Sequence, residues 1–171
     1  SQDTDYNPND LTAQLDFWHE LPGRSAVSND EGLHGVLLFF EGEDTTGGYD
    51  ERLVHLKDKG WLYESFDEPA DLAMQRGLLS HVLCRAMEIK GGVMMQLTKD
   101  NPRYAYKELV YLGVMPDGSG QMVVDGLDYV GVISRAQDWM VVRGMKAREK
   151  SIRDAAEAEE ELRDKTGAEL E

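Results

Sequence analysis

The chain has a single cysteine, Cys84, among its 171 residues, which excludes a disulfide framework and a thiolate metal cluster. Cys84 lies within an apolar helical face, where a thiol usually serves as a small core residue. Long hydrophobic runs are also lacking, since the longest, Val36–Phe40, contains five residues. A membrane-spanning helix needs about 18 apolar residues. We therefore expect no disulfide, no thiolate metal site and no transmembrane segment.

Positive charge is scarce, because 18 lysines and arginines stand against 33 aspartates and glutamates and give a net charge of −15. A field of this sign repels phosphate backbones and anionic lipid headgroups. We therefore expect no nucleic-acid partner. The signatures of P-loop and dinucleotide-binding proteins, Gly-x-Ser-x-Gly and His-Glu-x-x-His are missing as well. Nothing in the sequence points to a cofactor, and none is expected.

One helical pattern occurs three times along the chain. Its clearest copy is Met74–Ile89, where apolar residues recur at helical spacing and predict one buried face. Asp71 precedes this helix as a start signal, and Lys90–Gly92 follow it as a stop. A related stretch is Val124–Trp139, and a fainter one is Asn29–Phe40. The equivalent apolar places in the three copies are Leu33, Leu79 and Tyr129, then Val36, Val82 and Val132, then Leu37, Leu83 and Ile133.

These copies delimit the main domain, residues 10–140, with repeats at about 10–42, 49–92 and 101–139. Each repeat is predicted as a helix, a glycine stop, an apolar pair, an extended connector and a second helix. One such unit cannot bury its apolar face alone, so the copies must pack on one another. The sequence thus predicts a mainly α fold, with three helix–connector–helix repeats in a pseudo-threefold bundle. Helices are expected over residues 11–21, 29–41, 49–59, 74–89, 104–112 and 124–139, with a short strand or buried extended segment at 91–97.

Two appendages flank this domain. Residues 1–9 are polar and are expected to form a flexible arm. Residues 141–171 are rich in Ala, Glu, Arg and Lys, which favours a long charged helix. Trp139, Val142 and Met145 are expected to reach the core from the first half of this helix, and farther on its apolar face thins. The exposed part is a candidate interface for an oligomer or a larger assembly.

The repeated pattern resembles the S-layer homology domain, in which three repeats of this length each end in a helix that begins I-T-R-A-E and continues F-A-A-L-L-x-R-A-L. Met74–Leu79 lies at the opening signature, and Leu83–Met87 lies at the later R-A-L. In the third copy Val124–Tyr129 and Ile133–Ala136 take these places. Tyr104–Met115 is similar to the family's W-A-x-x-x-I … G-I-M segment. The resemblance covers about three-quarters of the chain.

This resemblance implies a three-repeat fold that binds anionic or pyruvylated cell-wall glycan through signature arginines in grooves between repeats. The chain keeps one of them as Arg76, while Gly126 and roughly Asp30 stand at the other places, and the signature acid is kept as Asp128. The candidate ligand-binding residues are cations for an anionic group and aromatic rings for stacking on sugars, namely Arg76, Arg24, Lys107, Trp61 and Tyr104. The same cations could instead form helix-capping salt bridges, and the aromatic rings could close the core.

Two residue pairs offer catalytic hypotheses. His81 and Cys84 lie one turn apart on one helix, where a histidine can activate a thiolate, although burial of both is the competing interpretation. Glu20 and Glu31 are the carboxylates that a glycosidase-type mechanism would use, against an ordinary solvated role for both. The four histidines are too scattered for an obvious metal site, so no metal is expected.

The absence of a catalytic signature favours a protein that binds over one that reacts. We expect a non-catalytic module of the cell envelope, periplasmic or extracellular after signal-peptide removal, that docks on cell-wall polysaccharide or on another envelope protein. The alternative is a subunit of a larger assembly that uses its C-terminal helix as the interface. A helical glycan-cleaving enzyme is the third hypothesis. The polar opening at Ser1, without an initiator Met, suits a segment that follows a cleaved signal peptide, and a chain shortened in another way would look the same.

Overall fold

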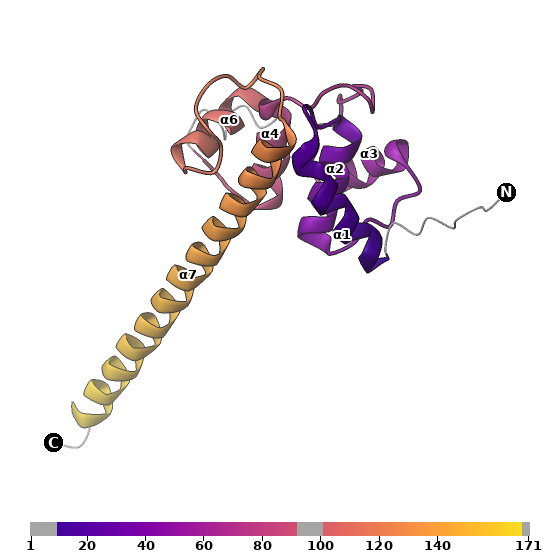
Figure 1. Cartoon of the computed structure of the whole chain (residues 1–171). Helices are drawn as coiled ribbons and strands as arrows, with labels where there is room; N and C mark the ends of the chain where they lie inside the picture. Colours follow the sequence, from indigo (N-terminus) through magenta and orange to yellow (C-terminus); the bar gives the residue numbers. More distant parts are fainter. Residues whose placement is uncertain (1–9, 92–100, 169–171) are drawn as a thin grey trace. The chain divides into compact units, whose positions relative to one another are not determined.

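The computed structural model describes residues 10–91 and 101–168 and is mainly helical, as the sequence predicts (Figure 1). The predicted arm at residues 1–9 and most of the predicted extended segment at 91–97 lie outside these ranges. By its internal contacts the chain divides into two compact units, Ser1–Ala136 and Gln137–Glu171. None of the helices in the described ranges has an apolar stretch long enough to cross a membrane.

Six α-helices and one short 3-10 helix make up the described part of the chain. In chain order they are α1 (Leu11–Glu20), η1 (Leu21–Gly23), α2 (Asn29–Glu41), α3 (Tyr49–Asp58), α4 (Arg76–Ala86), α6 (Pro102–Tyr111) and α7 (Gly126–Ala168). Extended pairing between the described residues is limited to two isolated bridges, Ser28 with Ala73 and Gln75 with Val123.

Local signals explain where several helices begin and end. Ser28 forms a capping box with Glu31 at the start of α2, and Gly42 ends that helix in the left-handed conformation, with a φ of 80°. Asp10 and Asn101 cap α1 and α6 through side-chain oxygens that accept backbone N–H groups. The predicted bounds of α2, α3 and α6 agree with the structure within two residues.

The helix α4 is shorter than the sequence predicts and starts differently. It begins at Arg76 without a side-chain cap, so the prediction of Asp71 as its start signal is wrong. The Arg76 N–H donates instead to the carbonyl of Met122 at 2.9 Å, a partner from a distant part of the chain. The helix ends at Ala86, before the predicted glycines, because Glu88 adopts a left-handed conformation with a φ of 55°.

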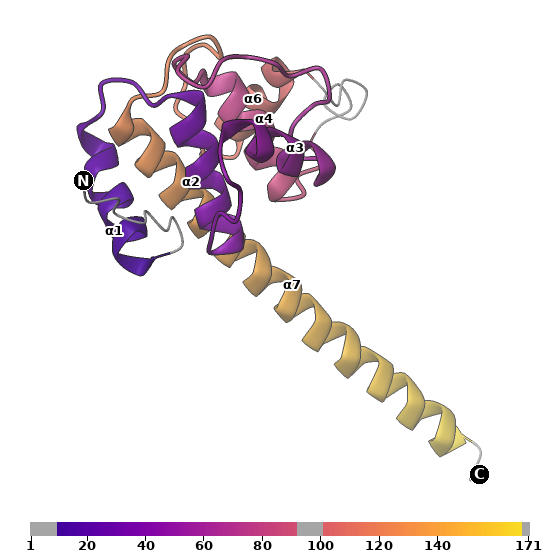
Figure 2. The same cartoon turned by 90° about the vertical axis from the view of Figure 1, so that its right-hand side faces the viewer.

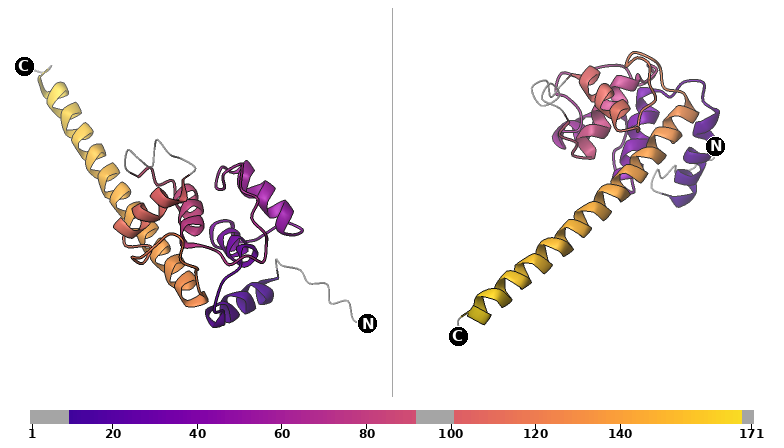
Figure 3. Two further views of the ribbon diagram at one scale, coloured as in Figure 1. Left: turned by 90° about the horizontal axis from the view of Figure 1, so that it is seen from above. Right: turned by 90° about the vertical axis from the view of Figure 1, so that its left-hand side faces the viewer.

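Three backbone segments meet in a closed ring of hydrogen bonds. Val27 N–H donates to Val124 at 2.8 Å, Val124 N–H donates to Met74 at 2.9 Å, and Met74 N–H donates to Val27 at 2.8 Å. Each of these fully buried residues lies two residues before a helix, α2, α4 or α7. The three helices therefore start around one common point, and α1 lies beside α2 and the start of α7 (Figures 2 and 3). The predicted bundle of three equivalent repeats stays a prediction that this ring supports.

The helices that leave the ring carry the equivalent apolar residues inside. Leu33, Leu79 and Tyr129 all have no exposed surface. Counted from the ring, however, Gly32 rather than Leu33 corresponds to Leu79 and Tyr129. The large Tyr129 ring explains this one-residue difference, because its hydroxyl donates to the Gly32 carbonyl at 2.6 Å. A Cβ on Gly35 would lie 2.6 Å from the same hydroxyl, so Gly35 makes room for the tyrosine, whereas a Cβ on Gly32 would lie 2.4 Å from the sulfur of Met74.

Helical spacing predicts that Leu11, Leu15, Trp18 and Leu21 share the inward face of the first helix, and the structure agrees with this only in part, with Leu21 1% exposed. Leu11 and Leu15, expected inside, are 69% and 51% exposed. Trp18 does meet the core as predicted, with its ring centroid 6.4 Å from that of Tyr129, and Phe17, which the prediction did not include, packs its ring edge-on against α2. Aromatic rings bury more apolar surface than leucines, which explains why they determine the orientation of this helix.

The second unit contains the outer part of α7. From residue 141 to residue 166 every side chain is exposed. The prediction that Val142 and Met145 reach the core is wrong, because they are 48% and 59% exposed. Trp139 is half-buried, and the Arg143 guanidinium lies 5.2 Å from the centre of its ring. The apolar side chains from residue 141 to residue 166 are therefore left to solvent within the single chain.

Candidate functional site

Arg76, the signature arginine that the resemblance suggests, opens α4 and meets two parts of the chain that are distant in sequence. Its Nη2 donates to Asp128 Oδ2 at 2.6 Å, and its Nη1 donates to the Asp117 carbonyl at 3.3 Å. The Arg76 side chain is 9% exposed, and its Nε has no hydrogen-bond partner among the described residues. The site thus holds a buried guanidinium that one carboxylate neutralises and that keeps one donor unused.

Arg76 lies two residues after Met74 of the ring. The residues that lie two places after the other ring members, Val27 and Val124, are not cations. Asn29 opens α2, one residue before the expected Asp30, and its side-chain amide donates to the Pro69 carbonyl at 3.1 Å. Gly126 opens α7, where a Cβ would lie 1.7 Å from the carbonyl oxygen of Leu21. Close backbone packing therefore accounts for Gly126 at the start of α7. At the start of α2, Asn29 has a shorter side chain than arginine but still offers a hydrogen-bond donor.

The remaining predicted ligand-binding residues lie at three other places. Arg24 pairs with Glu31 at 3.0 Å, with 51% of its side chain exposed. Lys107 and Tyr104 are neighbours on α6, with the ammonium 5.9 Å from the centre of the ring. Trp61 is half-buried, with a lysine ammonium 4.6 Å from its ring centre. The structure thus brings Tyr104 and Lys107 together, and none of the five candidates lines either of two cavities found in the first unit.

A buried ionic cluster, which the sequence analysis did not identify, joins the loop after α2 to α2 and α3. This Asp44 cluster consists of Asp30, His34, Asp44, Thr46 and Arg52. Asp44 Oδ2 accepts from Arg52 Nη2 and from His34 Nδ1, both at 2.6 Å, and its Oδ1 accepts from the Thr46 hydroxyl at 2.6 Å. Arg52 pairs with Asp30 on its other side. The Asp44 side chain has no exposed surface, whereas Asp30, at the edge of the cluster, is 48% exposed.

Asp44 is ionised in this setting. Burial acts to raise its pKa, but hydrogen bonds from His34 and Thr46 and the charge of Arg52 outweigh it and hold the pKa well below its usual range. An ionised carboxylate only accepts hydrogen bonds, so His34 Nδ1 carries a proton. Asp44 therefore orients His34 as a carboxylate orients a general base. The spacing Asp44-x-Thr46, which is typical of an Asx turn, could have identified this cluster from the sequence. Among 33 acidic residues, however, this spacing alone does not show which carboxylate is buried.

A cavity of about 590 Å³ opens beside the Asp44 cluster. The Thr46 hydroxyl, a potential nucleophile here, already donates to Asp44. Carboxylates outnumber cations in the wall, which suits a small polar or cationic group and disfavours a phosphate. The side chains that form this wall come from α1, α2, the loop after it and α3, namely Phe17, Asp30, Glu31, His34, Asp44, Thr45, Thr46 and Arg52.

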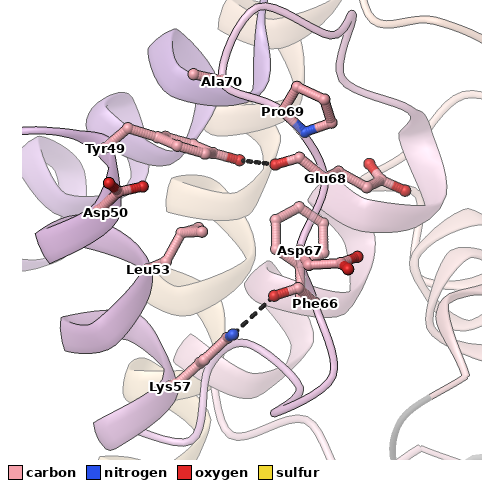
Figure 4. Close-up of a pocket in the computed structure, with 9 residues that line it drawn as sticks. All are labelled: Tyr49, Asp50, Leu53, Lys57, Phe66, Asp67, Glu68, Pro69 and Ala70. Atoms are coloured by element: carbon pink, nitrogen blue, oxygen red, sulfur yellow. Dashed lines mark hydrogen bonds between the residues drawn. The ribbon is translucent and has the colours of Figure 1, made fainter.

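A second cavity, of about 560 Å³, lies between α3 and the connector that leads to α4 (Figure 4). Two hydrogen bonds tie its sides together, from the Tyr49 hydroxyl to the Glu68 carbonyl at 2.8 Å and from the Lys57 ammonium to the Phe66 carbonyl at 2.7 Å. Burial and nearby carboxylates raise the pKa of Tyr49 to about 12, so the phenol remains a donor at neutral pH. Because both donors hold the connector, we regard this cavity as a structural junction.

The two catalytic hypotheses meet unfavourable geometry. Burial raises the pKa of the Cys84 thiol to about 12, so the group is a thiol and not a thiolate at neutral pH. His81 is buried and its ring packs edge-on against Tyr63, with 5.3 Å between the ring centres. Glu31 is engaged in the capping box of α2, and Glu20 is exposed. The Cys84 thiol is thus not poised as a nucleophile, and one carboxylate of the second pair already has hydrogen-bond partners in a cap.

Within residues 10–91 and 101–168, no group of three or more His, Cys, Asp or Glu side chains is arranged to hold a metal ion. Comparisons with protein-family models, with curated proteins and with solved structures found no match to this chain. The chain's own residues and their geometry are therefore the basis for inferring its function.

Proposed function

We propose that the chain is a non-catalytic docking module of the cell envelope, built from three repeats like those of the S-layer homology domain. The ring of Val27, Met74 and Val124 carries this proposal, because these residues stand at equivalent places, each two residues before a helix. A closed ring of three equivalent donors and acceptors is the pattern that a pseudo-threefold axis requires. The envelope location, periplasmic or extracellular, follows from the resemblance.

The state of the candidate reactive groups favours binding over catalysis. The Cys84 thiol is protonated and buried, and the Glu31 carboxylate caps a helix. His34 has an orienting carboxylate, but the hydroxyl nearest to that pair, Thr46, is engaged by Asp44. A module that docks needs none of these groups to react.

The ligand of this module is cell-wall glycan, and the docking place includes Arg76. Its guanidinium is neutralised by Asp128, whose side chain is 31% exposed and is the partner that can leave. An anionic group on the glycan would then take the place of this carboxylate, and the unused Nε would offer a further donor. Binding is therefore an exchange of one anion for another at a buried guanidinium.

Retention of the full chain on purified cell-wall sacculi tests this exchange. Arg76→Ala removes a charge-assisted hydrogen bond and is expected to weaken retention by about tenfold or more. Asp128→Asn removes the competing anion and leaves Arg76 in place, so it is expected to strengthen retention. The two variants thus change binding in opposite directions, which a loss of folding in both would not do.

Arg103→Ala is the matched control, because Arg103 is an exposed cation on α6 and its removal changes the net charge equally. Its retention should equal that of the unmodified chain. Circular dichroism of each variant checks that the helices persist. Retention that is unaffected by both Arg76→Ala and Asp128→Asn would contradict docking at this place.

A second candidate function, a subunit of a larger assembly, is favoured by the side chains of α7. Val141, Met145, Ile152 and Leu162 are 56%, 59%, 62% and 64% exposed. Apolar side chains that recur along one exposed helix indicate a surface that another helix covers. Size measurements of the purified chain test this second function, because they detect association between chains.

A further inference from the structure

Six exposed side chains form a seam along the outer part of α7. Their positions follow alternating steps of three and four residues, the spacing that keeps side chains on one face of a helix in a coiled coil. They span about 26 Å at the usual helical rise. The members of this seam are Met145, Arg148, Ile152, Ala155, Glu159 and Leu162.

Two charged residues interrupt the seam at symmetric places. Arg148 lies four residues before Ile152, and Glu159 lies four residues after Ala155. When two such helices run in opposite directions with Ile152 opposite the second copy's Ala155, Arg148 of each copy faces Glu159 of the other. The same register places Met145 opposite Leu162. Every apolar side chain of the seam then faces an apolar one, and every charged side chain faces one of opposite charge.

We propose that the outer part of α7 pairs with a second copy of this chain as an antiparallel coiled coil, in which Arg148 of each copy binds Glu159 of the other. The inference goes beyond docking on the cell wall and does not rest on it. Opposite charges within an otherwise apolar seam select register and orientation, because any other alignment leaves them facing like charges or apolar groups.

A parallel pair is disfavoured by the same residues. In parallel coiled coils each seam position faces its own equivalent, so two Arg148 side chains would meet, and so would two Glu159 side chains. Like charges at such close approach repel and disfavour the parallel pair. The antiparallel pair converts both repulsive layers into attractive ones with no change of sequence.

The surroundings of Glu159 suit this pairing. Its carboxylate already accepts a hydrogen bond from Arg163 of the same helix at 3.0 Å, with both side chains largely exposed. In the dimer each Glu159 would lie between Arg163 of its own chain and Arg148 of the other. Ser151 and Ala158 border the centre of the seam and are small, so they allow the two helices to approach closely.

Sedimentation equilibrium of the full chain over a series of concentrations tests the proposal. The unmodified chain is expected to form dimers. Arg148→Glu places two carboxylates opposite each other and should raise the dissociation constant by about tenfold or more. The double variant R148E/E159R exchanges the two charges, restores both pairs and should return the dissociation constant to that of the unmodified chain.

Lys150→Glu is the matched control, because Lys150 lies outside the seam and undergoes the same change of charge. It should leave dimerisation unchanged. Orientation is tested by cysteine cross-linking, since Met145→Cys mixed with Leu162→Cys should yield a disulfide-linked pair, while Met145→Cys alone should not. A chain that stays monomeric at every concentration, a double variant that is not restored, or efficient cross-linking of Met145→Cys alone would overturn the proposal.

Discussion

At the scale of single residues, Asp44 is a fully buried charged group of the first unit. It has no exposed side-chain surface and accepts hydrogen bonds from His34, Thr46 and Arg52. A charge in such a place stabilises the fold only while its partners remain, because a buried ion that loses its partner is costly. The Asp44 cluster therefore responds strongly to the loss of one charge.

Asp44→Asn keeps the shape of the side chain and removes its charge. We expect it to lower the free energy of unfolding by about 3 kcal/mol, near the lower end for a broken buried pair, because Asp30 still holds Arg52. Urea unfolding followed by circular dichroism measures the change. Glu43→Gln, at the exposed neighbouring residue, is the control and should have little effect. Equal stability of Asp44→Asn and the unmodified chain would contradict this role.

The pH dependence follows from the lowered pKa of Asp44. A carboxyl whose pKa is lower in the folded than in the unfolded chain contributes stability that is fully present above the unfolded value, about 3.9. That contribution is lost as the pH falls below this value toward the folded pKa. Below about pH 4, unfolding free energies should therefore converge for the unmodified chain and Asp44→Asn. A constant difference down to the lowest accessible pH would argue against an ionised, paired Asp44.

Gly35 has no side chain where the Tyr129 ring packs, and this leaves the space that the ring occupies. Its Cβ would lie 2.6 Å from the Tyr129 hydroxyl, so Gly35→Ala should destabilise the fold by about 1–3 kcal/mol through overpacking. Tyr129→Phe removes the hydroxyl, and the double variant G35A/Y129F should lose less than the sum of the two single effects. Gly23→Ala, with no heavy atom within 4 Å of the new Cβ, is the control. Strictly additive losses in urea unfolding would contradict this account.

At the scale of elements, α4 is the helix most enclosed by the rest of the first unit. Its residues from Arg76 to Cys84 are all buried, including the polar Ser80 and His81. A surface helix buries one stripe, whereas a helix that is buried on all sides lies inside the fold. This explains why the sequence presents the repeated pattern most clearly in α4.

The enclosure of α4 makes Cys84 a probe of its burial. Because the pKa of this thiol is raised to about 12, we expect the native chain not to react with a thiol reagent such as DTNB at neutral pH. The same reagent should react readily after unfolding in urea. A folded chain that reacts as fast as the unfolded one would show that α4 opens, or that the thiol is accessible.

The success of the sequence predictions differs between elements for physical reasons. The bounds of α2, α3 and α6 are encoded locally, in caps and in glycine or proline residues, and were predicted closely. The start of α4 depends on a backbone bond to Met122, and the inward position of Phe17 on α1 depends on its ring meeting His34. Such long-range contacts leave no local pattern. The Asp44 cluster was missed for a related reason, since nothing in the sequence marks which of many acids is buried.

At the scale of the whole molecule, the net charge of −15 is unevenly distributed along the chain. Residues 1–136 contain 23 acidic and 11 basic residues, whereas residues 137–171 contain 10 and 7. Self-repulsion between like charges destabilises a compact unit. The first unit should therefore experience most of this effect, although several of its cations are held in ion pairs such as Arg76–Asp128 and Arg52–Asp44.

Salt acts on these two kinds of charge differently, and this decides the sign of its effect on stability. Raising the ionic strength from about 0.01 M to about 0.15 M shortens the screening length from about 30 Å to about 8 Å, which weakens repulsion across the surface. Buried pairs at close contact are screened much less. We therefore expect salt to stabilise the fold, and a gain of about 1 kcal/mol would raise the thermal midpoint by about 2–4 °C.

The variant that isolates this repulsion changes one exposed acid that takes part in none of the ion pairs described above. Glu64→Lys reverses the charge of an exposed connector residue, so its thermal midpoint at low salt should exceed that of the unmodified chain and should rise less as salt is added. Glu64→Gln should give an intermediate result, because it removes one charge where the lysine changes two. A thermal midpoint that falls with added salt would mean that the ion pairs contribute more to stability than surface repulsion takes away. In that case Asp44→Asn should reduce the decrease of the midpoint with salt. The direction of the salt response thus shows whether surface repulsion or internal pairing dominates the electrostatic free energy of this acidic chain.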